Sequence, residues 1–530
     1  MPMDNYSQDI FFYIRGFYVS IVFIDGKSLS LNDLVLAARQ GRKVELGEAA
    51  KESIKKSREY VDRLVQEGRV VYGITTGFGE FSKVSIAKDE TEFLQKNLIV
   101  SHACGVGNHL PADSVRALML LRINALSKGF SGIRLETVQT LIDMLNAGLC
   151  PAIPEKGSLG ASGDLAPLSH MVLPLLGLGE AYYNGELLPG AEAMKRAGIT
   201  PVVLTSKEGL ALINGTQVMT GIGALALYDG LNLLKLCDIA AALTFEALNG
   251  VTDAYMPDIH EIRPHEGQMD TASNLLRLLA GSERVTKSGE LRVQDGYSLR
   301  CVPQVHGASK DALRYVAGKV AIEMNAVTDN PIILAGKDMA VSGGNFHGQP
   351  MALSFDFMGI ALAEMANISE RRIERLVNPS LSDGLPAFLI EQGGLHSGFM
   401  IAQYSAAALV SENKVLSHPA SVDSIPSSAG QEDHVSMGTI AARKARDIYF
   451  NASRVAAIEL FAAAQALDLS PRRKGKKLGK GTQAAYDIIR SVVDTLTSDR
   501  ELYLDFNKVA ALIDTNKIVE AVEAAVGELK

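Results

Sequence analysis

Apolar residues recur every three or four positions along most of this chain, which is the period of an amphipathic α-helix. One face of such a helix, for example, is shared by Ile54, Val61, Leu64 and Val65. A second helix is expected to begin at Asp113, which suits an N-cap, and a third to end at Gly148. The pattern therefore predicts a protein built mainly from helices.

The predicted helices become long and rich in Ala and Leu beyond residue 205. Several are apolar on most faces, as helices inside a bundle are. Strand patterns are few and short, so the expected fold class is mainly α, a large bundle of long helices with a loop-rich N-terminal region. Polar side chains interrupt the first long segment too often for a membrane span. The long segments are 208–250, 310–328, 353–377, 396–417, 438–468 and 507–528.

The chain of 530 residues exceeds the usual size of one domain. We divide it into an N-terminal extension, 1–21, a loop-rich region, 22–205, and a helical region, 206–530. The extension is apolar and aromatic from Phe11, but it is too short for a membrane span. We expect it to pack on a neighbouring surface or on another subunit.

Composition excludes several classes of function. With 47% hydrophobic and 21% charged residues, the chain is typical of a globular protein with a large core and no membrane partner. Its net charge of −8 gives nucleic acid no general binding surface. The 4 cysteines form no CxxC pair, which favours reduced thiols in the cytoplasm. The 10 histidines show no HExxH spacing, so no metal site is expected.

The stretch GSLGASGDLAPLSH, which begins at Gly157, fits no helical or strand period. Glycines such as Gly160 are typical of a surface turn, but they also let the backbone bend for a chemical purpose. In a tight turn, the nitrogen of Gly163 can attack the carbonyl carbon of Ala161. Loss of two waters, one of them from Ser162, then leaves a methylidene-imidazolone, an electrophile that needs no external cofactor.

This stretch resembles the signature of the aromatic amino acid ammonia-lyases and aminomutases, whose prosthetic group is that ring. The likeness runs from about residue 22 to 450, and six ordered motifs carry it rather than one Ala-Ser-Gly. The other five stretches that are similar to family motifs, in the family's order, are YGITTGFG, LINGTQ, QDGYSLR, VTDNP and NFHG.

The resemblance implies a role for individual residues. Ala161, Ser162 and Gly163 form the 4-methylidene-imidazol-5-one (MIO), which the substrate amine attacks. Tyr72 corresponds to the base that takes a proton from the substrate's β-carbon, so its site must favour the phenolate, whose ordinary pKa is near 10. Arg300 corresponds to the residue that holds the substrate carboxylate. The family also has polar residues around the ring and the amine, which would offer fixed donors; they correspond to Asn214, Gln294 and Tyr297. Phe346 corresponds to an aromatic residue that packs near the ring.

Two positions concern the substrate's ring. Ser101-His102 and Glu432, the latter within QED, match the histidine-selective members of the family, whereas phenylalanine- and tyrosine-selective members usually have NQD. A carboxylate and an imidazole can hydrogen-bond both nitrogens of an imidazole, but beside a phenyl ring each would cost about 1–3 kcal/mol. The resemblance thus implies conversion of L-histidine to trans-urocanate and ammonia by a homotetramer with shared active sites.

Alternatives stay open at this point. The chain could be a tyrosine or phenylalanine lyase or aminomutase, and Glu432 could belong to a structural salt bridge. A different class is a non-catalytic relative kept as a helical assembly or binding protein. The intact Ala-Ser-Gly and Tyr72 argue against that class.

Overall fold

The computed structural model describes residues 11–14, 17–69, 71, 74, 91–471 and 475–530, so the predicted base Tyr72 lies outside the described residues. The chain forms two compact units, each built from three separate segments. The consecutive regions 1–21, 22–205 and 206–530 remain a prediction. The first unit contains Met1–Tyr228, Ala317–Asp356 and Pro419–Arg443, and the second contains Asp229–Val316, Phe357–His418 and Lys444–Lys530.

The first unit combines short helices with small sheets of two or three strands. Its helices are α1 (Leu31–Gln40), α2 (Glu48–Gln66), α3 (Thr91–His102), α4 (Ala112–Ser127), α5 (Leu135–Ala147), α6 (Leu165–Val172), α7 (Gly190–Arg196) and α8 (Glu208–Ile213). Its strands are β1 (Phe11–Ile14), β2 (Phe17–Ser20), β3 (Val22–Ile24), β4 (Val44–Leu46), β5 (Val106–His109), β6 (Cys150–Pro151), β7 (Pro154–Lys156), β8 (Glu180–Tyr183), β9 (Glu186–Pro189), β10 (Ile332–Leu334) and β11 (Met339–Val341).

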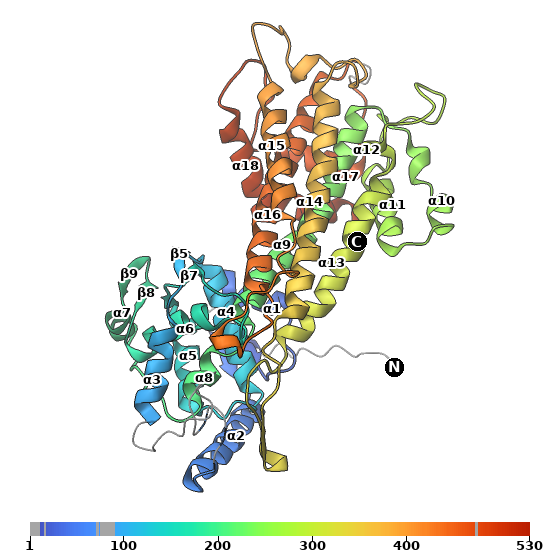
Figure 1. Ribbon diagram of the computed structural model, residues 1–530. Coiled ribbons are helices and arrows are strands. Elements are labelled where there is room, and N and C mark those ends of the chain that lie inside the picture. Colours follow the sequence, from blue (N-terminus) through green and yellow to red (C-terminus); the bar gives the residue numbers. More distant parts are fainter. Residues whose placement is uncertain (1–10, 15–16, 70, 72–73, 75–90, 472–474) are drawn as a thin grey trace. The chain divides into compact units, whose positions relative to one another are not determined.

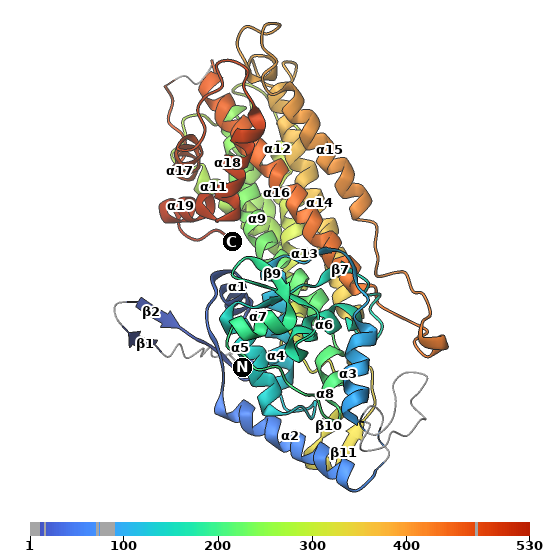
Figure 2. The same ribbon diagram turned by 90° about the vertical axis from the view of Figure 1, so that its left-hand side faces the viewer.

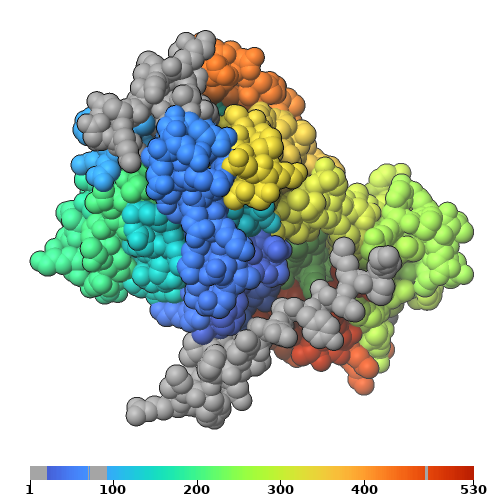
Figure 3. Space-filling view, turned by 90° about the horizontal axis from the view of Figure 1, so that it is seen from below, coloured from blue at the N-terminus to red at the C-terminus, as the bar shows by residue number. Residues whose placement is uncertain are grey.

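Segments far apart in sequence meet within the first unit. Helix α2 packs against the hairpin β10–β11, where Val61 and Leu64 share an apolar cluster with Ile333. Figure 3 shows this face, with α2 in blue beside the hairpin in yellow. The predicted apolar face of α2 is confirmed: three of its members, Ile54, Val61 and Leu64, are buried, and Val65 packs partly buried against the same cluster. Burial of this face against other elements, the distant hairpin among them, gives the amphipathic helix most of its stability.

Among the described residues, four long helices have residues in both units, and seven further helices belong to the second unit. Figures 1 and 2 show α9, α13, α14, α15 and α16 side by side in the second unit, which confirms a mainly α fold with a bundle of long helices. The long helices are α9 (Gln217–Ala247), α13 (Val302–Met324), α14 (Gln349–Val377) and α16 (Gly438–Leu469). The others are α10 (Pro257–Glu261), α11 (Glu266–Leu278), α12 (Tyr297–Arg300), α15 (Met400–Leu416), α17 (Lys480–Arg490), α18 (Leu502–Asp514) and α19 (Lys517–Val526).

Several predicted helix ends are wrong. Helix α4 begins at Ala112 with Pro111 as its N-cap, so Asp113 lies in the first turn. Its negative charge there interacts favourably with the positive end of the helix dipole. The segment expected as one helix over 507–528 is interrupted where Asn516 adopts a φ of 57°. Gly148, in contrast, caps α5 in the left-handed conformation, as expected.

Buried polar groups join the helices of the second unit. The Nδ1–H of His306 on α13 donates to Asp238 on α9 (2.7 Å), and Lys310 Nζ donates to the same carboxylate (2.6 Å). Arg372 on α14 pairs with Glu459 on α16, with 2.5 Å from Nε to Oε1 and 2.9 Å from the second nitrogen to Oε2. We call these five residues the ion cluster. It compensates buried charge with opposite charge.

Among the described residues, α14 is the helix long and apolar enough to cross a membrane by length and composition alone. Since 67% of its most apolar window is buried, a place in the protein core accounts for this composition. All four cysteines are free thiols, with Cys150 and Cys237 buried.

Candidate active site

The Ala-Ser-Gly sequence lies at the tip of a tight turn between β7 and α6. Gly160 and Gly163 face each other as a single antiparallel bridge, so Ala161 and Ser162 form the tip. Ser162 has a φ of 49° and Gly163 a φ of 79°. The left-handed region is unfavourable for a serine, so the surrounding structure must hold this backbone in place.

Neighbouring backbone crowds this turn from two sides. A Cβ atom on Gly163 would lie 2.1 Å from the carbonyl oxygen of Gly215, and one on Gly160 would lie 2.2 Å from Ser436 Oγ. The Gly215 N–H donates to the carbonyl of Ser162 (3.2 Å), and the Asp164 N–H donates to the carbonyl of Gly215 (2.8 Å). Glycine is required at both positions because no other residue fits the space.

Asp164 anchors the turn to the start of α9. Its fully buried carboxylate accepts from the backbone N–H groups of Val218 and Met219 (2.9 Å each) and from Ser158 Oγ (3.0 Å) and Thr439 Oγ1. Burial raises the pKa of Asp164, while these hydrogen bonds oppose the rise. Its partners among the described residues are all neutral donors, so the turn is held without a counter-charge.

Asn214 lies immediately before Gly215, and its orientation is fixed from behind. Its amide nitrogen donates to Asp329 Oδ1 (3.2 Å) and to the carbonyl of Asn330 (3.0 Å), both of which can only accept. The Asn214 side-chain oxygen is therefore the atom left over, and it is buried without a partner among the described residues. We expected Asn214 to offer a hydrogen-bond donor to the site. Its free group is instead the side-chain oxygen, which is an acceptor.

Two buried cations support Asn214 and its partner carboxylate. Lys207 Nζ lies 2.7 Å from Asp329 Oδ2, with both side chains shielded from solvent. Arg122 donates to the backbone carbonyl of Asn214 (2.7 Å) and to Gln217 Oε1 (2.9 Å). Burial lowers the pKa of Arg122 to about 10, although Asp329 opposes this. These residues fix the carbonyl and the side chain of Asn214 together.

Glu432 lies within hydrogen-bond distance of the turn. Ser162 Oγ donates to Glu432 Oε1 (3.3 Å), and Ser427 Oγ donates to Oε2 (3.0 Å). Ser427 and Glu432 also pair through their backbones. Glu432 forms no ion pair with Lys or Arg in the part of the chain that the structure describes. The interpretation of Glu432 as a structural salt bridge is therefore not supported.

His102, at the end of α3, is half-buried and interacts electrostatically with Glu432. Its Nδ1 lies 3.0 Å from Ser101 Oγ, which donates to the carbonyl of Leu98 (3.1 Å). A carbonyl can only accept, so the serine hydrogen points away from the ring, and Nδ1 carries its own hydrogen. Burial lowers the pKa of His102, whereas Leu98 and Glu432 oppose this. The neutral ring thus keeps Nε2 as an acceptor.

Phe346 lies half-buried in the loop between β11 and α14. This loop reaches the same region as the turn, since a Cβ on Gly348 would lie 2.5 Å from Met219 Sδ and 2.9 Å from Ser436 Oγ. Ser436 is also the residue that crowds Gly160. The loop that carries Phe346 and the Ala-Ser-Gly turn therefore share neighbours.

Gln294, Tyr297 and Arg300 belong to the second unit. The Tyr297 side chain is 71% exposed, and the Arg300 guanidinium lies 4.5 Å from the centre of its ring. The Nε of Arg300 is buried and has no hydrogen-bond partner in the part of the chain that the structure describes. The first unit thus gathers the remaining described candidates, which are His102, Ala161, Ser162, Gly163, Asn214, Phe346 and Glu432.

Several residues of this site were missed by sequence reasoning. Asp329 lies in the VTDNP motif and Asp164 directly follows Ala-Ser-Gly, so both stood within recognised stretches. Lys207 and Arg122 carry no such signal, because a charged residue in a helical pattern is expected at the surface. Their burial was the informative feature, and only the structure shows it.

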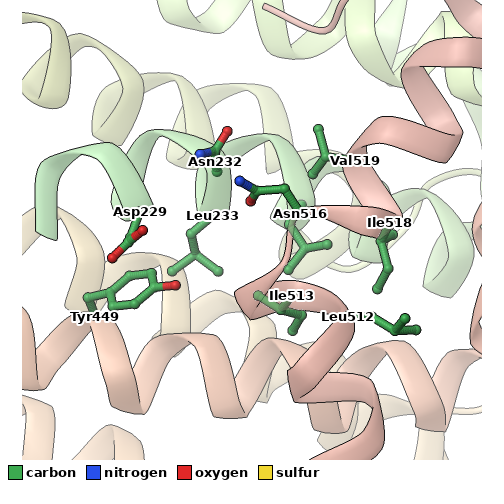
Figure 4. Close-up of a pocket in the computed structure, with 10 residues that line it drawn as sticks. Asp229, Asn232, Leu233, Tyr449, Leu512, Ile513, Asn516, Ile518 and Val519 are labelled. Atoms are coloured by element: carbon green, nitrogen blue, oxygen red, sulfur yellow. The ribbon is translucent and has the colours of Figure 1, made fainter. Parts of the chain in front are cut away.

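One cavity in the second unit is a poor alternative. In the second unit, a cavity of about 10 Å³ lies beside α9, α16 and the α18–α19 connection, with Asp229, Tyr449 and Asn516 among its lining residues (Figure 4). This volume holds about one water molecule and cannot hold an amino acid. Among the described residues, no three His, Cys, Asp or Glu side chains are grouped to hold a metal ion.

Comparison with known proteins adds independent findings. The family described as aromatic amino acid lyase matches residues 29–491. A histidine ammonia-lyase of Alkaliphilus oremlandii (strain OhILAs) is 66% identical over 505 residues, covering 95% of this chain and 99% of the relative. The crystal structure of a histidine ammonia-lyase from Trypanosoma cruzi is similar at 43% identity and a TM-score of 0.89, with 96% of each chain covered. A tyrosine aminomutase from Streptomyces globisporus is similar at 39% identity and a TM-score of 0.92, covering 96% of this chain and 100% of that one.

Proposed function

The chain belongs to the aromatic amino acid lyase family, and from this premise we propose that it removes ammonia from L-histidine to give trans-urocanate. It is a carbon–nitrogen lyase. One observation carries the choice of substrate: Glu432 lies within hydrogen-bond distance of Ser162, and His102 interacts electrostatically with Glu432. Relatives with this activity that are 57–66% identical over most of the chain support the same choice.

The residues of the turn fit the prosthetic group that the family uses. Ala161 and Ser162 stand at the tip of the turn, and the space against Gly215 admits only glycine at position 163. A glycine nitrogen with no Cβ beside it is the nucleophile that cyclisation onto Ala161 requires. When formed, the ring supplies an electrophile that binds the substrate amine and makes nitrogen a better leaving group.

The chain's own residues then position the substrate and move its proton. Asn214, held in this orientation by Asp329, offers its side-chain oxygen to an N–H of the substrate amine. Arg300 holds the carboxylate through two parallel hydrogen bonds. Tyr72 takes the β-proton, and Tyr297, Gln294 and Phe346 complete the surroundings.

The imidazole of the substrate is recognised by Glu432, which accepts the N–H of that ring, and by His102 beside it. Both are oriented by hydroxyl groups rather than by charge, through Ser427 and Ser101 respectively. A substrate with a phenyl ring would leave these groups buried and unpaired, at a cost of about 1–3 kcal/mol each. This difference favours L-histidine over L-tyrosine and L-phenylalanine.

We further propose a homotetramer whose active sites combine residues of different subunits. Large apolar side chains are exposed on helices of the bundle, including Tyr315, Phe357, Ile401, Tyr404 and Phe450, and they suit burial against further copies. The exposed Tyr297 would be covered by the same assembly. The N-terminal extension is proposed to pack on such a neighbouring surface. The four free cysteines support a place in the reducing cytoplasm.

An ultraviolet assay of the purified protein with histidine, tyrosine and phenylalanine side by side tests the proposal. Only the true substrate yields a product whose ring is conjugated to the new double bond. Histidine is expected to give by far the highest kcat/KM. A higher kcat/KM for tyrosine would instead support the aminomutase or tyrosine lyase alternative. No product with any of the three would favour a non-catalytic relative.

A further inference from the structure

We propose that Glu432 has a second task that is complete before any substrate binds. Its carboxylate carries a proton from the Cα of Ser162 to the Oγ of the same residue, so that the Ser162 hydroxyl leaves as water. This inference rests on the proposed function, in which Ala161, Ser162 and Gly163 form the prosthetic group. Glu432 is then a catalytic residue in the formation of the prosthetic group, and it also recognises the imidazole of the substrate.

The geometry around Ser162 carries the inference. Ser162 Oγ donates to Glu432 Oε1 at 3.3 Å, while the other carboxylate oxygen is held by Ser427 Oγ at 3.0 Å. The Cα of Ser162 is only two bonds from Oγ, so one carboxylate can serve both atoms. The serine is held at its left-handed φ of 49° by the hydrogen bond from Gly215 N–H to its carbonyl. Both partners are therefore fixed in place.

The step balances without any further reagent. After the nitrogen of Gly163 has joined the carbonyl carbon of Ala161, the Glu432 carboxylate accepts the Cα proton of Ser162. The electron pair of the broken C–H bond forms the double bond between Cα and Cβ, and the Cβ–Oγ bond breaks. The same proton passes from Glu432 to Oγ, water leaves, and the carboxylate is regenerated.

Asp164 is the other carboxylate beside this turn, and it is less suited to the step. One of its oxygens accepts from Ser158 and Thr439, and the other accepts from two backbone N–H groups. These bonds direct its lone pairs towards structural partners. The hydroxyl of Ser162 points instead to Glu432.

The two tasks of Glu432 follow one another in time. While the serine is intact, its hydroxyl occupies Glu432 Oε1. Once that hydroxyl has left, Oε1 loses this donor and is free to accept an N–H from the substrate's ring. Completion of the prosthetic group would therefore also open the recognition site for the substrate.

Intact-mass measurement of Glu432→Gln tests the inference without reference to activity. Glutamine keeps the shape and an acceptor oxygen but cannot take up a proton. Freshly made wild-type protein is expected to become lighter by two waters. The loss of the Ser162 water in Glu432→Gln should be slower by about 10²–10⁴-fold, the usual worth of positioned proton transfer.

Glu432→Ala with added sodium acetate distinguishes a lost proton carrier from a change in the structure of the turn. A small carboxylate that enters the vacated space should restore the loss of the second water, whereas sodium chloride at equal concentration should not. Asp433→Asn is the matched control, since it removes an exposed carboxylate next to Glu432, whereas the Ser162 hydroxyl donates to Glu432. It should lose two waters at the wild-type rate.

The outcomes separate this inference from the proposed function. Loss of both waters at the wild-type rate in folded Glu432→Gln would overturn the maturation role and leave the substrate assignment intact. Failure of acetate to restore dehydration in folded Glu432→Ala would likewise count against it. If the wild-type protein itself kept its full sequence mass, the proposed function would fail first.

Discussion

Two buried aspartates, one in each unit, show how differently the two regions treat charge. Burial raises the pKa of Asp164, beside the Ala-Ser-Gly turn, and only neutral hydroxyl and N–H donors oppose the rise. Burial also acts to raise the pKa of Asp238, in the ion cluster, but Lys310 and His306 outweigh it and lower that pKa below the usual value. Both side chains are fully buried.

The difference separates a region built for stability from one built for chemistry. In the ion cluster, each carboxylate faces a cation, so the buried charges compensate one another and hold the helices in register. Around the turn, Asp164 is held by neutral donors, which fix its position without neutralising it. Its uncompensated carboxylate is costly to bury, and burial therefore raises its pKa.

The largest effect is expected from Ser162→Ala, which should abolish the chemistry of the turn without affecting stability. Without the serine hydroxyl no exocyclic methylidene can form, so nearly all activity should disappear while folding and assembly remain intact. Intact mass provides the check, because the wild type should be lighter than its sequence by two waters. A wild-type mass without that deficit would refute the ring.

Tyr72→Phe removes a phenol from the same chemistry and keeps the ring for packing. The loss should fall mainly on kcat, by about 10²–10⁴-fold, because proton transfer is made only in the transition state. Steady-state kinetics with L-histidine measures it. If turnover stayed above about a tenth of the wild-type value, Tyr72 would not be the base.

Arg372→Met tests the ion cluster. It leaves Glu459 buried without its cation, which should lower the free energy of unfolding by about 3–5 kcal/mol. Denaturant unfolding followed by circular dichroism measures this loss, and intact mass should still show the two-water deficit. A stable Arg372→Met protein that fails to lose both waters would break the division between the regions.

The recognition residues offer a subtler change in the chemical region. Ser101→His and His102→Leu together with Glu432→Gln should shift the ratio of kcat/KM values away from histidine by about 30-fold or more, at 1–3 kcal/mol per lost contact. Intact mass must first show that this variant has matured. The double variant without the Glu432 change serves as the comparison. An unchanged ratio in mature protein would place specificity elsewhere.

The smallest expected effect is the pH response of the ion cluster. Burial lowers the pKa of His306, and Arg372 donates to its Nε2 at 3.3 Å, which keeps the folded imidazole neutral. Below the ordinary histidine pKa of 6.5, the unfolded chain takes up a proton that the folded state refuses, so stability falls as pH falls. Unfolding curves at several pH values should be flatter for His306→Gln. A wild-type stability that rose on acidification below pH 6.5 would contradict this sign.

The helices and the chemistry of the turn could be predicted because both depend on near neighbours. Ile54, Val61 and Leu64 specify the buried face of α2 through their spacing alone, and Ala161, Ser162 and Gly163 are adjacent in the chain. The errors arose where a local rule was overridden. Asp113 was an acceptable N-cap, but the helix begins two residues earlier than that cap would place it. Asn516 breaks a segment whose apolar pattern continues.

The sequence by itself determined the helical class, the family and the residue types that the chemistry needs. Only the tertiary structure decided which groups meet: Glu432 reaches Ser162 across 270 positions of the chain, and Asp329 turns the amide of Asn214 so that an acceptor remains. Periodicity and motifs describe neighbours along the chain. Distances between remote side chains follow from how helices and loops pack, and burial then sets their charge and orientation.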